Sequence, residues 1–316
     1  MLMNIALTAI GSMSSEAVIK SLKNNCECKI IGFDIYPQEW IVTSKLVDYF
    51  YQVPLTNDKK YTEYVLEICK SNKVDFLIPL TDPEIDVLCM QIQKFHTQGI
   101  TLCCSNPHSI QIARNKFNLF SFFTQNREVS VIPTFENIDH IDMNNYDVII
   151  AKPRKGRSSE GVIISKNKQH LQNAIEQAQD YIFQPYIEGI YITVDTIRDK
   201  FKNQVSIARK ELLRTVNGAG IVIELFNDDK LNYIVNQITE SLDIIGCINI
   251  ELIFSQGKYF IMDINPRFSA GIGFSIIAGY DFIENHIKCF QGVTIDKEIP
   301  YNQQIISKRY IEIIHT

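Results

Sequence analysis

Two acidic residues and an amide near residue 260 have the types and spacing of a metal site. Asp263 and Asn265 stand two positions apart in an apolar run, so both side chains face the same side of a strand. Glu251 lies on the preceding predicted strand and joins that face if it pairs opposite Asp263. The two carboxyl groups would then lie about 5 Å apart and repel one another unless a divalent cation binds between them. Ligands that are all oxygen atoms favour Mg²⁺ or Mn²⁺.

The turn between these two strands decides whether the acids share a face. Glu251 pairs opposite Asp263 if the loop has an odd number of residues, such as 256–258, with one of its last two residues left-handed. A two-residue turn at 256–257 would instead place Glu251 opposite Met262, unless a bulge corrects the register. The alternative reading, two acids on an exposed hairpin, fits poorly because the surrounding residues are strongly apolar.

A lysine and a glycine-flanked loop further upstream form a candidate phosphate site. The predicted strand Asp147–Pro153 places Lys152 near its end, and a short loop leads directly into the next strand. Backbone N–H groups of a small, hydroxylated loop can approach phosphate oxygens closely. A solvated lysine beside an ordinary flexible hairpin is an equally good reading of either feature alone. A Walker-type loop is excluded because its pattern is absent. The loop residues concerned are Gly156, Ser158, Ser159 and Gly161.

The segment Tyr181–Gly189 reads as a strand that runs into a short connection. Backbone groups at such a strand edge can pair with an adenine, and Tyr186 and Ile187 can pack against the faces of the base. A buried strand that ends in a turn is the more common explanation of this pattern.

The elements that must position these residues predict an α/β protein. Strands and helices alternate in the first part of the chain, which is typical of a parallel sheet covered by helices. Later strands are joined by hairpin-like turns, which predict antiparallel sheets. We therefore expect an N-terminal parallel α/β domain over residues 1–106, followed by a two-lobed α+β fold. Its small lobe would span residues 107–188 and its large lobe residues 189–316.

Several of the predicted elements are tested below. We expect strands at Asn4–Ile10, Lys29–Asp34, Val74–Leu80, Ile100–Cys104, Gln204–Arg209, Cys247–Phe254 and Tyr259–Ile264, and helices at Ser14–Lys23, Tyr61–Ser71, Pro83–Thr97, 107–125, Asp228–Asp243 and Asp281–Cys289.

Composition limits the classes of partner. The 316 residues are 46% hydrophobic, and 31 basic residues against 36 acidic ones give a net charge of -5, so a general nucleic-acid surface is not expected. No stretch is long enough to cross a membrane, and the short apolar amino terminus reads as a buried strand rather than a signal peptide. The eight cysteines form no CxxC pair and predict free thiols in a cytoplasmic protein.

In their order along the chain, these features resemble the ATP-grasp enzymes, most closely the carbamoyl-phosphate-synthase-like branch of carboxylate–amine ligases. The run Asp263–Arg267 is similar to the family's metal signature, an acid followed at alternate positions by Asn and Arg. Ala151–Pro153 with its loop, and then Gln184–Gly189, precede it in the family's order. The resemblance spans nearly the whole chain and implies a pre-ATP-grasp domain before the two lobes that hold ATP.

When the family's functional residues are carried over to the matching positions of this sequence, the resemblance implies a full set of site residues. ATP would be bound by Lys116, Lys152, Gly156, Ser158, Ser159, Gly161, Gln184, Tyr186 and Ile187, Mg²⁺ or Mn²⁺ by Glu251, Asp263 and Asn265, and the transferred phosphoryl group by Arg267 together with Lys152. Two positions depart from the family pattern. Asn115 replaces an acid before the helix lysine, and the usual ribose-binding acid is missing, so Glu188 or Asp195 is expected to take its place.

The resemblance implies an enzyme that makes an acyl phosphate and joins it to an amine, with release of ADP and phosphate. Its substrates would be a small-molecule carboxylate, such as an amino acid, and an amine. Arg209 and Arg214 are candidate carboxylate ligands and Gly271 can leave room for an acyl group, although strand-face charges and a helix entry explain them equally well. Alternatives are a nucleotide-binding regulatory module, or a carboxy-phosphate-forming relative without an amine acceptor. A homodimer is expected only because homodimers are common among cytoplasmic enzymes of this kind.

Overall fold

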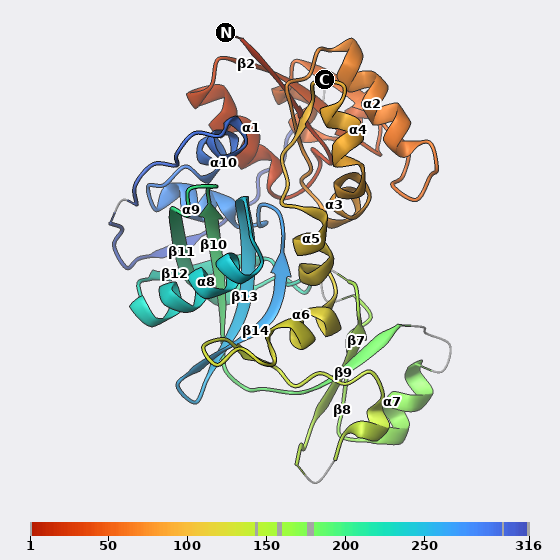
Figure 1. Cartoon of the computed structure of the whole chain (residues 1–316), viewed down its shortest axis with the longest axis vertical. Helices are drawn as coiled ribbons and strands as arrows, with labels where there is room; N and C mark the ends of the chain where they lie inside the picture. Colours follow the sequence, from red (N-terminus) through yellow and green to blue (C-terminus); the bar gives the residue numbers. More distant parts are fainter. Residues whose placement is uncertain (1, 143–144, 157–159, 176–179, 299, 315–316) are drawn as a thin grey trace.

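The computed structural model describes residues 2–142, 145–156, 160–175, 180–298 and 300–314. Its strands form three sheets, of five, seven and three strands. In Figure 1 the first 100 residues lie at the top, the seven-stranded sheet occupies the centre and the three-stranded sheet projects at the bottom. The predicted fold class, a parallel α/β domain followed by antiparallel sheets, is confirmed.

The five-stranded sheet is parallel throughout and has the order β3-β2-β1-β4-β5. The buried apolar residues at the centre of β1 and β2 explain why these strands lie inside, between layers of helices. Its strands are β1 (Met3–Leu7), β2 (Cys28–Asp34), β3 (Tyr49–Gln52), β4 (Phe76–Ile78) and β5 (Thr101–Leu102), and its helices are α1 (Ser15–Asn25), α2 (Tyr61–Ser71), α3 (Asp82–Leu88) and α4 (Ile92–His96).

The seven-stranded sheet has the order β15-β12-β11-β10-β13-β14-β6 and is antiparallel except at β14–β6. Its strands are β6 (Ser130–Val131), β10 (Ile190–Arg198), β11 (Gln204–Arg214), β12 (Gly220–Phe226), β13 (Gly246–Ser255), β14 (Lys258–Asn265) and β15 (Ile305–Ser307). The helices that accompany it are α5 (Pro107–Ala113), α6 (Lys116–Phe123), α8 (Asp229–Ser241), α9 (Ile272–Ile277) and α10 (Phe282–Gln291). Four short 3-10 helices lie at Gln38–Trp40, Val42–Leu46, Cys89–Gln91 and Ile138–His140.

The hairpin β13–β14 pairs Glu251 with Asp263 as expected, but its turn is not the odd loop that was expected. Its turn has two residues, because Ser255 pairs with Lys258, so the prediction of an odd loop was wrong. A bulge between Glu251 and Leu252 compensates: Leu252 pairs with Ile261 and Glu251 with Asp263, which leaves one extra residue on β14. The extra residue shifts the register by one and returns both acids to the same face.

The three-stranded sheet has the order β8-β7-β9 and carries one helix. Its elements are β7 (Ile149–Pro153), β8 (Ile163–Ser165), β9 (Tyr181–Pro185) and α7 (Lys168–Ile175). A small core of its own fills it, built from residues such as Ile149, Ala151, Leu171 and Phe183. In the part of the chain that the structure describes, no helix is both long and apolar enough to cross a bilayer.

Candidate active site

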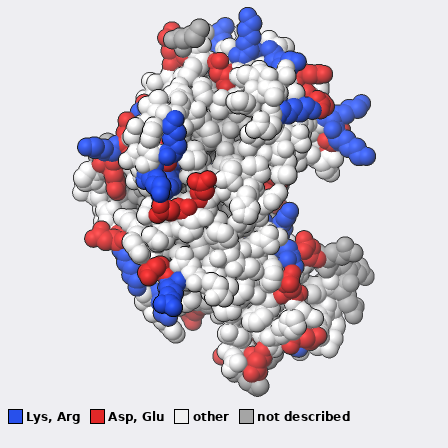
Figure 2. Space-filling model, in the orientation of Figure 1, with Lys and Arg blue, Asp and Glu red and all other residues white. Residues whose placement is uncertain are grey.

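One cavity of about 470 Å³ lies between the three-stranded sheet and the hairpin β13–β14. Figure 2 shows the molecule hollowed where the small lobe projects, with positively charged side chains at the inner edge of the hollow. The predicted site residues that line the cavity are Lys116, Lys152, Gly156, Tyr186, Arg209, Arg214, Glu251, Asp263, Asn265, Arg267 and Gly271. Five segments far apart in the sequence therefore contribute to one site.

The first of the two lysines is positioned by a helix start. Asn115 caps α6, since its side chain accepts hydrogen bonds from the backbone N–H groups of Phe117 and Asn118. An amide caps a helix as well as a carboxylate does, which explains why Asn can replace the acid that is usual at this position. Lys116 is thereby held at the first position of α6, and its Nζ lies 2.9 Å from Oδ2 of Asp263.

The second lysine stands at the end of β7. Lys152 is buried, and burial together with the neighbouring Lys116 lowers its pKa to about 8, although Asp263 and Glu251 oppose the shift. Two lysines that line the same cavity and interact electrostatically favour an anion there.

The carboxylates face one another on the hairpin as the bulge dictates. Burial and then the charge of Asp263 raise the pKa of Glu251, which is an electrostatic conflict that a bound cation would relieve. Asn265 donates from Nδ2 to Oε1 of Glu251 at 3.1 Å, and Arg214 approaches Oε2 at 3.6 Å. The three oxygen-bearing side chains are thus adjacent, and their chemistry fits Mg²⁺ or Mn²⁺. Among the described residues, no three His, Cys, Asp or Glu side chains cluster as a metal site.

Arg267 is fixed by a residue that the sequence did not single out. Asp82, at the start of α3 in the N-terminal part of the chain, accepts hydrogen bonds from Nε and Nη2 of Arg267, both at 2.9 Å. Asp82 is 1% exposed and also lies 3.6 Å from Arg114. A fork-shaped, two-bond contact of this kind fixes the plane of the guanidinium. The acid and the helix start are visible in the sequence, but only the tertiary structure brings them to Arg267.

An apolar wall completes the cavity, with residues from the three-stranded sheet and its surroundings and one residue from β14. Tyr186 lies there with residues that the sequence analysis did not predict, namely Ile150, Val162, Ile164 and Met262. Met262 is the extra residue of the bulge, so a single irregularity both aligns the acids and adds an apolar side chain to the wall. Apolar side chains of this kind suit the faces of an aromatic base.

Some predicted residues lie elsewhere. Gln184 does not line the cavity and donates to the hydroxyl of Thr134 at 2.7 Å, whereas Ile187, Glu188 and Gly161 lie outside its lining. Ser158 and Ser159 fall outside the described residues.

Asp195 does not fit the predicted contact with a ribose. It is completely buried, and its carboxylate oxygens already accept hydrogen bonds from Arg209, Ser275 and Asn249. Asp195 was expected only as a substitute ribose ligand, and the arginine on β11 that neutralises it could not be assigned to it from the sequence.

Comparisons with known proteins agree with this geometry. The family model described as ATP-grasp domain matches residues 113–271, and the model of the PylC-like N-terminal domain matches residues 5–103. The D-alanine–D-alanine ligase of Petrotoga mobilis is 26% identical over 231 residues, which are 60% of this chain and 73% of that protein. The carbamoyl phosphate synthase large chain of Thermoplasma acidophilum is 23% identical over 249 residues, 71% of this chain but only 23% of that one.

Among solved structures, the biotin carboxylase of Campylobacter jejuni superposes with a TM-score of 0.77 at 15% identity, over 93% of this chain and 72% of that one. At this identity the likeness shows the fold alone. The family model matches half of the chain, and it spans both lysines and the complete hairpin with its acids. The chain therefore belongs to the ATP-grasp family.

Proposed function

We propose that this protein is an ADP-forming carboxylate–amine ligase that uses ATP and Mg²⁺. The observation that carries the proposal is the meeting, in one cavity, of the charged groups that phosphoryl transfer needs: Lys116, Lys152, Glu251, Asp263, Asn265 and Arg267. The D-alanine–D-alanine ligase relative supports a ligase rather than a regulatory module or a relative without an amine acceptor.

The role proposed for each residue follows from its charge. ATP carries about four negative charges, and phosphoryl transfer depends mainly on positioning and on neutralising them. Lys116 and Lys152 would contact the phosphates, while Glu251, Asp263 and Asn265 would hold Mg²⁺, whose positive charge would offset that of the phosphates. Lys116 is paired with Asp263 in this structure, so its contact with a phosphate would require it to leave that carboxylate.

The other contacts proposed are those with the adenine, the ribose and the transferred phosphoryl group. Tyr186 and Met262 would pack against the adenine. Glu188, which is exposed and lies between β9 and β10, stays the proposed ribose ligand. Arg267 would meet the transferred phosphoryl group.

We place the carboxylate substrate near Arg214 and Gly271. Arg209 is less available because Asp195, Glu211 and Ser269 already engage its donors. A cytoplasmic location is supported by the eight cysteines, all of which are free thiols. A homodimer remains a prediction, which the molecular mass in solution would test.

The test is ADP release from Mg²⁺-ATP against an array of amino acids, offered singly and in pairs. We expect release that requires one particular pair, with phosphate as the other product, and its loss in Asp263→Ala. Asp229→Ala, which changes an exposed acid of α8, is the matched control and should retain activity. Failure of the wild type to bind Mg²⁺-ATP would overturn the proposal.

A further inference from the structure

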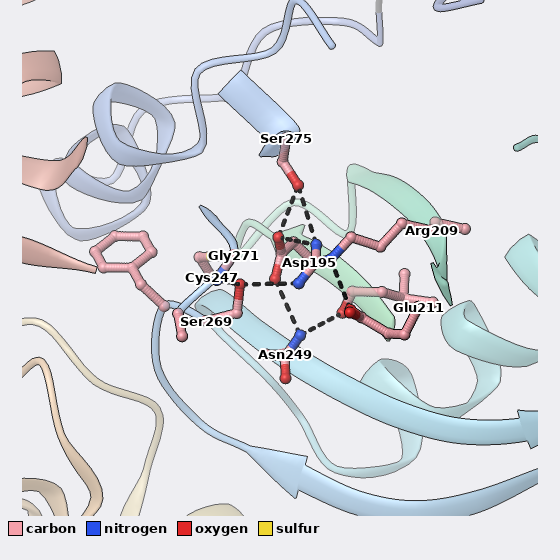
Figure 3. A network of polar contacts seen from close by, with 12 residues as sticks. Asp195, Arg209, Glu211, Cys247, Asn249, Ser269, Gly271 and Ser275 are labelled. Atoms are coloured by element: carbon pink, nitrogen blue, oxygen red, sulfur yellow. Dashed lines mark hydrogen bonds and ion pairs between the residues drawn. The ribbon is translucent and has the colours of Figure 1, made fainter. Parts of the chain in front are cut away.

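A buried polar network lies beside the hairpin, at the end of the cavity formed by β10 and β11 (Figure 3). Arg209 stands at its centre and is 2% exposed. Its Nη1 donates to Asp195 at 2.6 Å, its Nη2 to Ser269 at 3.1 Å and its Nε to Oε1 of Glu211 at 3.2 Å. One guanidinium thus serves two carboxylates.

The second oxygen of Glu211 is the unusual atom in this network. The Glu211 side chain is 3% exposed and the residue lines the cavity, yet its Oε2 has no hydrogen-bond partner among the described residues. A buried carboxylate oxygen without a donor is costly, so its presence calls for a ligand that supplies one.

The chain makes room for this oxygen. Gly220 on β12 lies so close that a Cβ atom built on it would approach Oε2 of Glu211 to 2.2 Å. Any other residue at position 220 would therefore displace the carboxylate. The absence of a side chain at Gly220 therefore allows the carboxylate its observed position.

Two positively charged side chains lie near Glu211 without donating a hydrogen bond to its Oε2. Arg209 carries one positive charge against the two carboxylates of Asp195 and Glu211. Lys308 also approaches the network, but its ammonium donates to the carbonyl of Ala270 and lies 5.0 Å from the Phe274 ring. Burial, and then Arg209, lower the pKa of Lys308, whereas Glu211 and Asp195 act against that shift. Arg209 donates to Oε1 of Glu211 and Lys308 to Ala270, so Oε2 lacks a donor although both cations lie near it.

The network is connected to the proposed metal site. Asn249 donates from Nδ2 to Asp195 at 3.0 Å and accepts at Oδ1 from Asn265 at 3.3 Å. Asn265 in turn contacts Glu251. A group bound at Glu211 would consequently lie in the same cavity as the reacting phosphate, on the side of β11 rather than of the lysines.

We infer that Glu211 is the binding site for the amino group of the amine substrate, which docks as a primary ammonium on Oε2. The inference rests on the proposed ligase function and specifies which residue recognises the acceptor. An ammonium supplies the missing donor, and a hydrogen bond between two charged groups is of the strong kind.

The first test compares steady-state kinetics of the full chain and of Glu211→Gln, which keeps the shape and removes the charge. The KM for the amine should rise about tenfold or more, as the loss of one charge-assisted bond predicts, while the KM for ATP stays unchanged. Glu224→Gln is the matched control, because Glu224 lies one strand away, pairs with Lys210 and does not line the cavity. Gly220→Ala should reproduce the effect of Glu211→Gln. An unchanged amine KM in both variants would overturn the inference.

A second test does not depend on turnover. Propylammonium chloride at millimolar concentration should show saturation-transfer NMR contacts with the wild type and with Glu224→Gln, but not with Glu211→Gln; propanol should show none. Binding of propylammonium without any amine-dependent ADP release would leave the subsite standing and reject the ligase. Amine-dependent ADP release with equal propylammonium contacts in wild type and Glu211→Gln would reject the subsite and leave the ligase.

Discussion

Lys152 is the residue whose charge in the cavity responds most to pH. Because its pKa is about 8 in the free protein, it is protonated below pH 8 and loses its charge above it. Bound phosphate favours the protonated form, so the pKa rises in the complex and ATP affinity falls only as pH increases beyond about 8. We expect the KM for ATP to be flat from pH 6.5 to 7.5 and to rise toward tenfold per pH unit above 8.

Lys152→Arg is the control for this profile, since a guanidinium stays charged throughout the range. The rise above pH 8 should be absent in that variant, whatever its absolute KM. A rise of the same size in Lys152→Arg would assign the titration to another group.

At this scale, residue spacing together with the family resemblance pointed to residues that line the cavity better than to their partners. Lys116, Lys152 and the hairpin acids could be predicted because the order of motifs is read along the chain. Asp195 was misjudged because an acid in a strand gives no sign of the arginine on the neighbouring strand. Asp82 and Glu211 were missed for the same reason, since burial and pairing across strands or domains are properties of the tertiary structure.

Among the elements, the turn of β13–β14 offers the clearest stability test. Gln256 and Gly257 both have positive φ, 48° and 75°, as a two-residue turn of the mirror-image type requires. Gln256→Asn should raise the free energy of unfolding by about 0.5 kcal/mol, because Asn tolerates this conformation better than Gln. Gly257→Ala should lower it by about 1 kcal/mol, because alanine pays the cost of a left-handed backbone.

Urea unfolding at constant protein concentration measures both changes, and ADP release should stay as in the wild type because the turn lies at the far end of the hairpin from Asp263. Equal stability of the two variants would contradict the conformation of the turn.

The sequence predicted some long elements well but missed others, since β12 was not predicted and β11 was expected to end at Arg209. The helix Tyr61–Ser71 was predicted with its observed ends, whereas the expected helix Pro83–Thr97 is divided by a 3-10 segment into α3 and α4. Strands β3 and β15 were not predicted, since edge strands of three or four residues are defined by the strand they join. The bulge was weighed only as an exception, because a single extra residue leaves no mark in the apolar pattern.

In the molecule as a whole, the first and last parts of the chain share one core. Ile5 and Leu7 of β1 belong to the same buried cluster as Ile197 of β10 and Phe282 of α10. Periodicity predicts which face of each element is buried but not which distant element covers it. The contact between Asp82 and Arg267 lies at the same junction and gives it a role beyond packing.

Asp82→Asn tests that role. Burial alone would raise the pKa of Asp82, but Arg267 and Arg114 lower it, so the pairing stabilises the fold at neutral pH and is lost as pH falls through the lowered pKa. Removing the charge leaves two arginines without their shared carboxylate, which should cost about 3 kcal/mol of unfolding free energy. It also frees the Arg267 guanidinium, so kcat should fall about tenfold or more while the KM for ATP changes little.

Asp86→Asn separates the two effects, because Asp86 binds Arg114, forms no hydrogen bond or ion pair with Arg267 in the described part of the chain, and is about one-third exposed. This variant should lose less stability and keep its kcat. If Asp82→Asn loses stability while kcat stays at the wild-type value, Asp82 only joins the two parts of the chain. If kcat falls in Asp82→Asn and not in Asp86→Asn, the N-terminal domain positions the arginine that meets the phosphoryl group, and the junction between the domains is part of the active site.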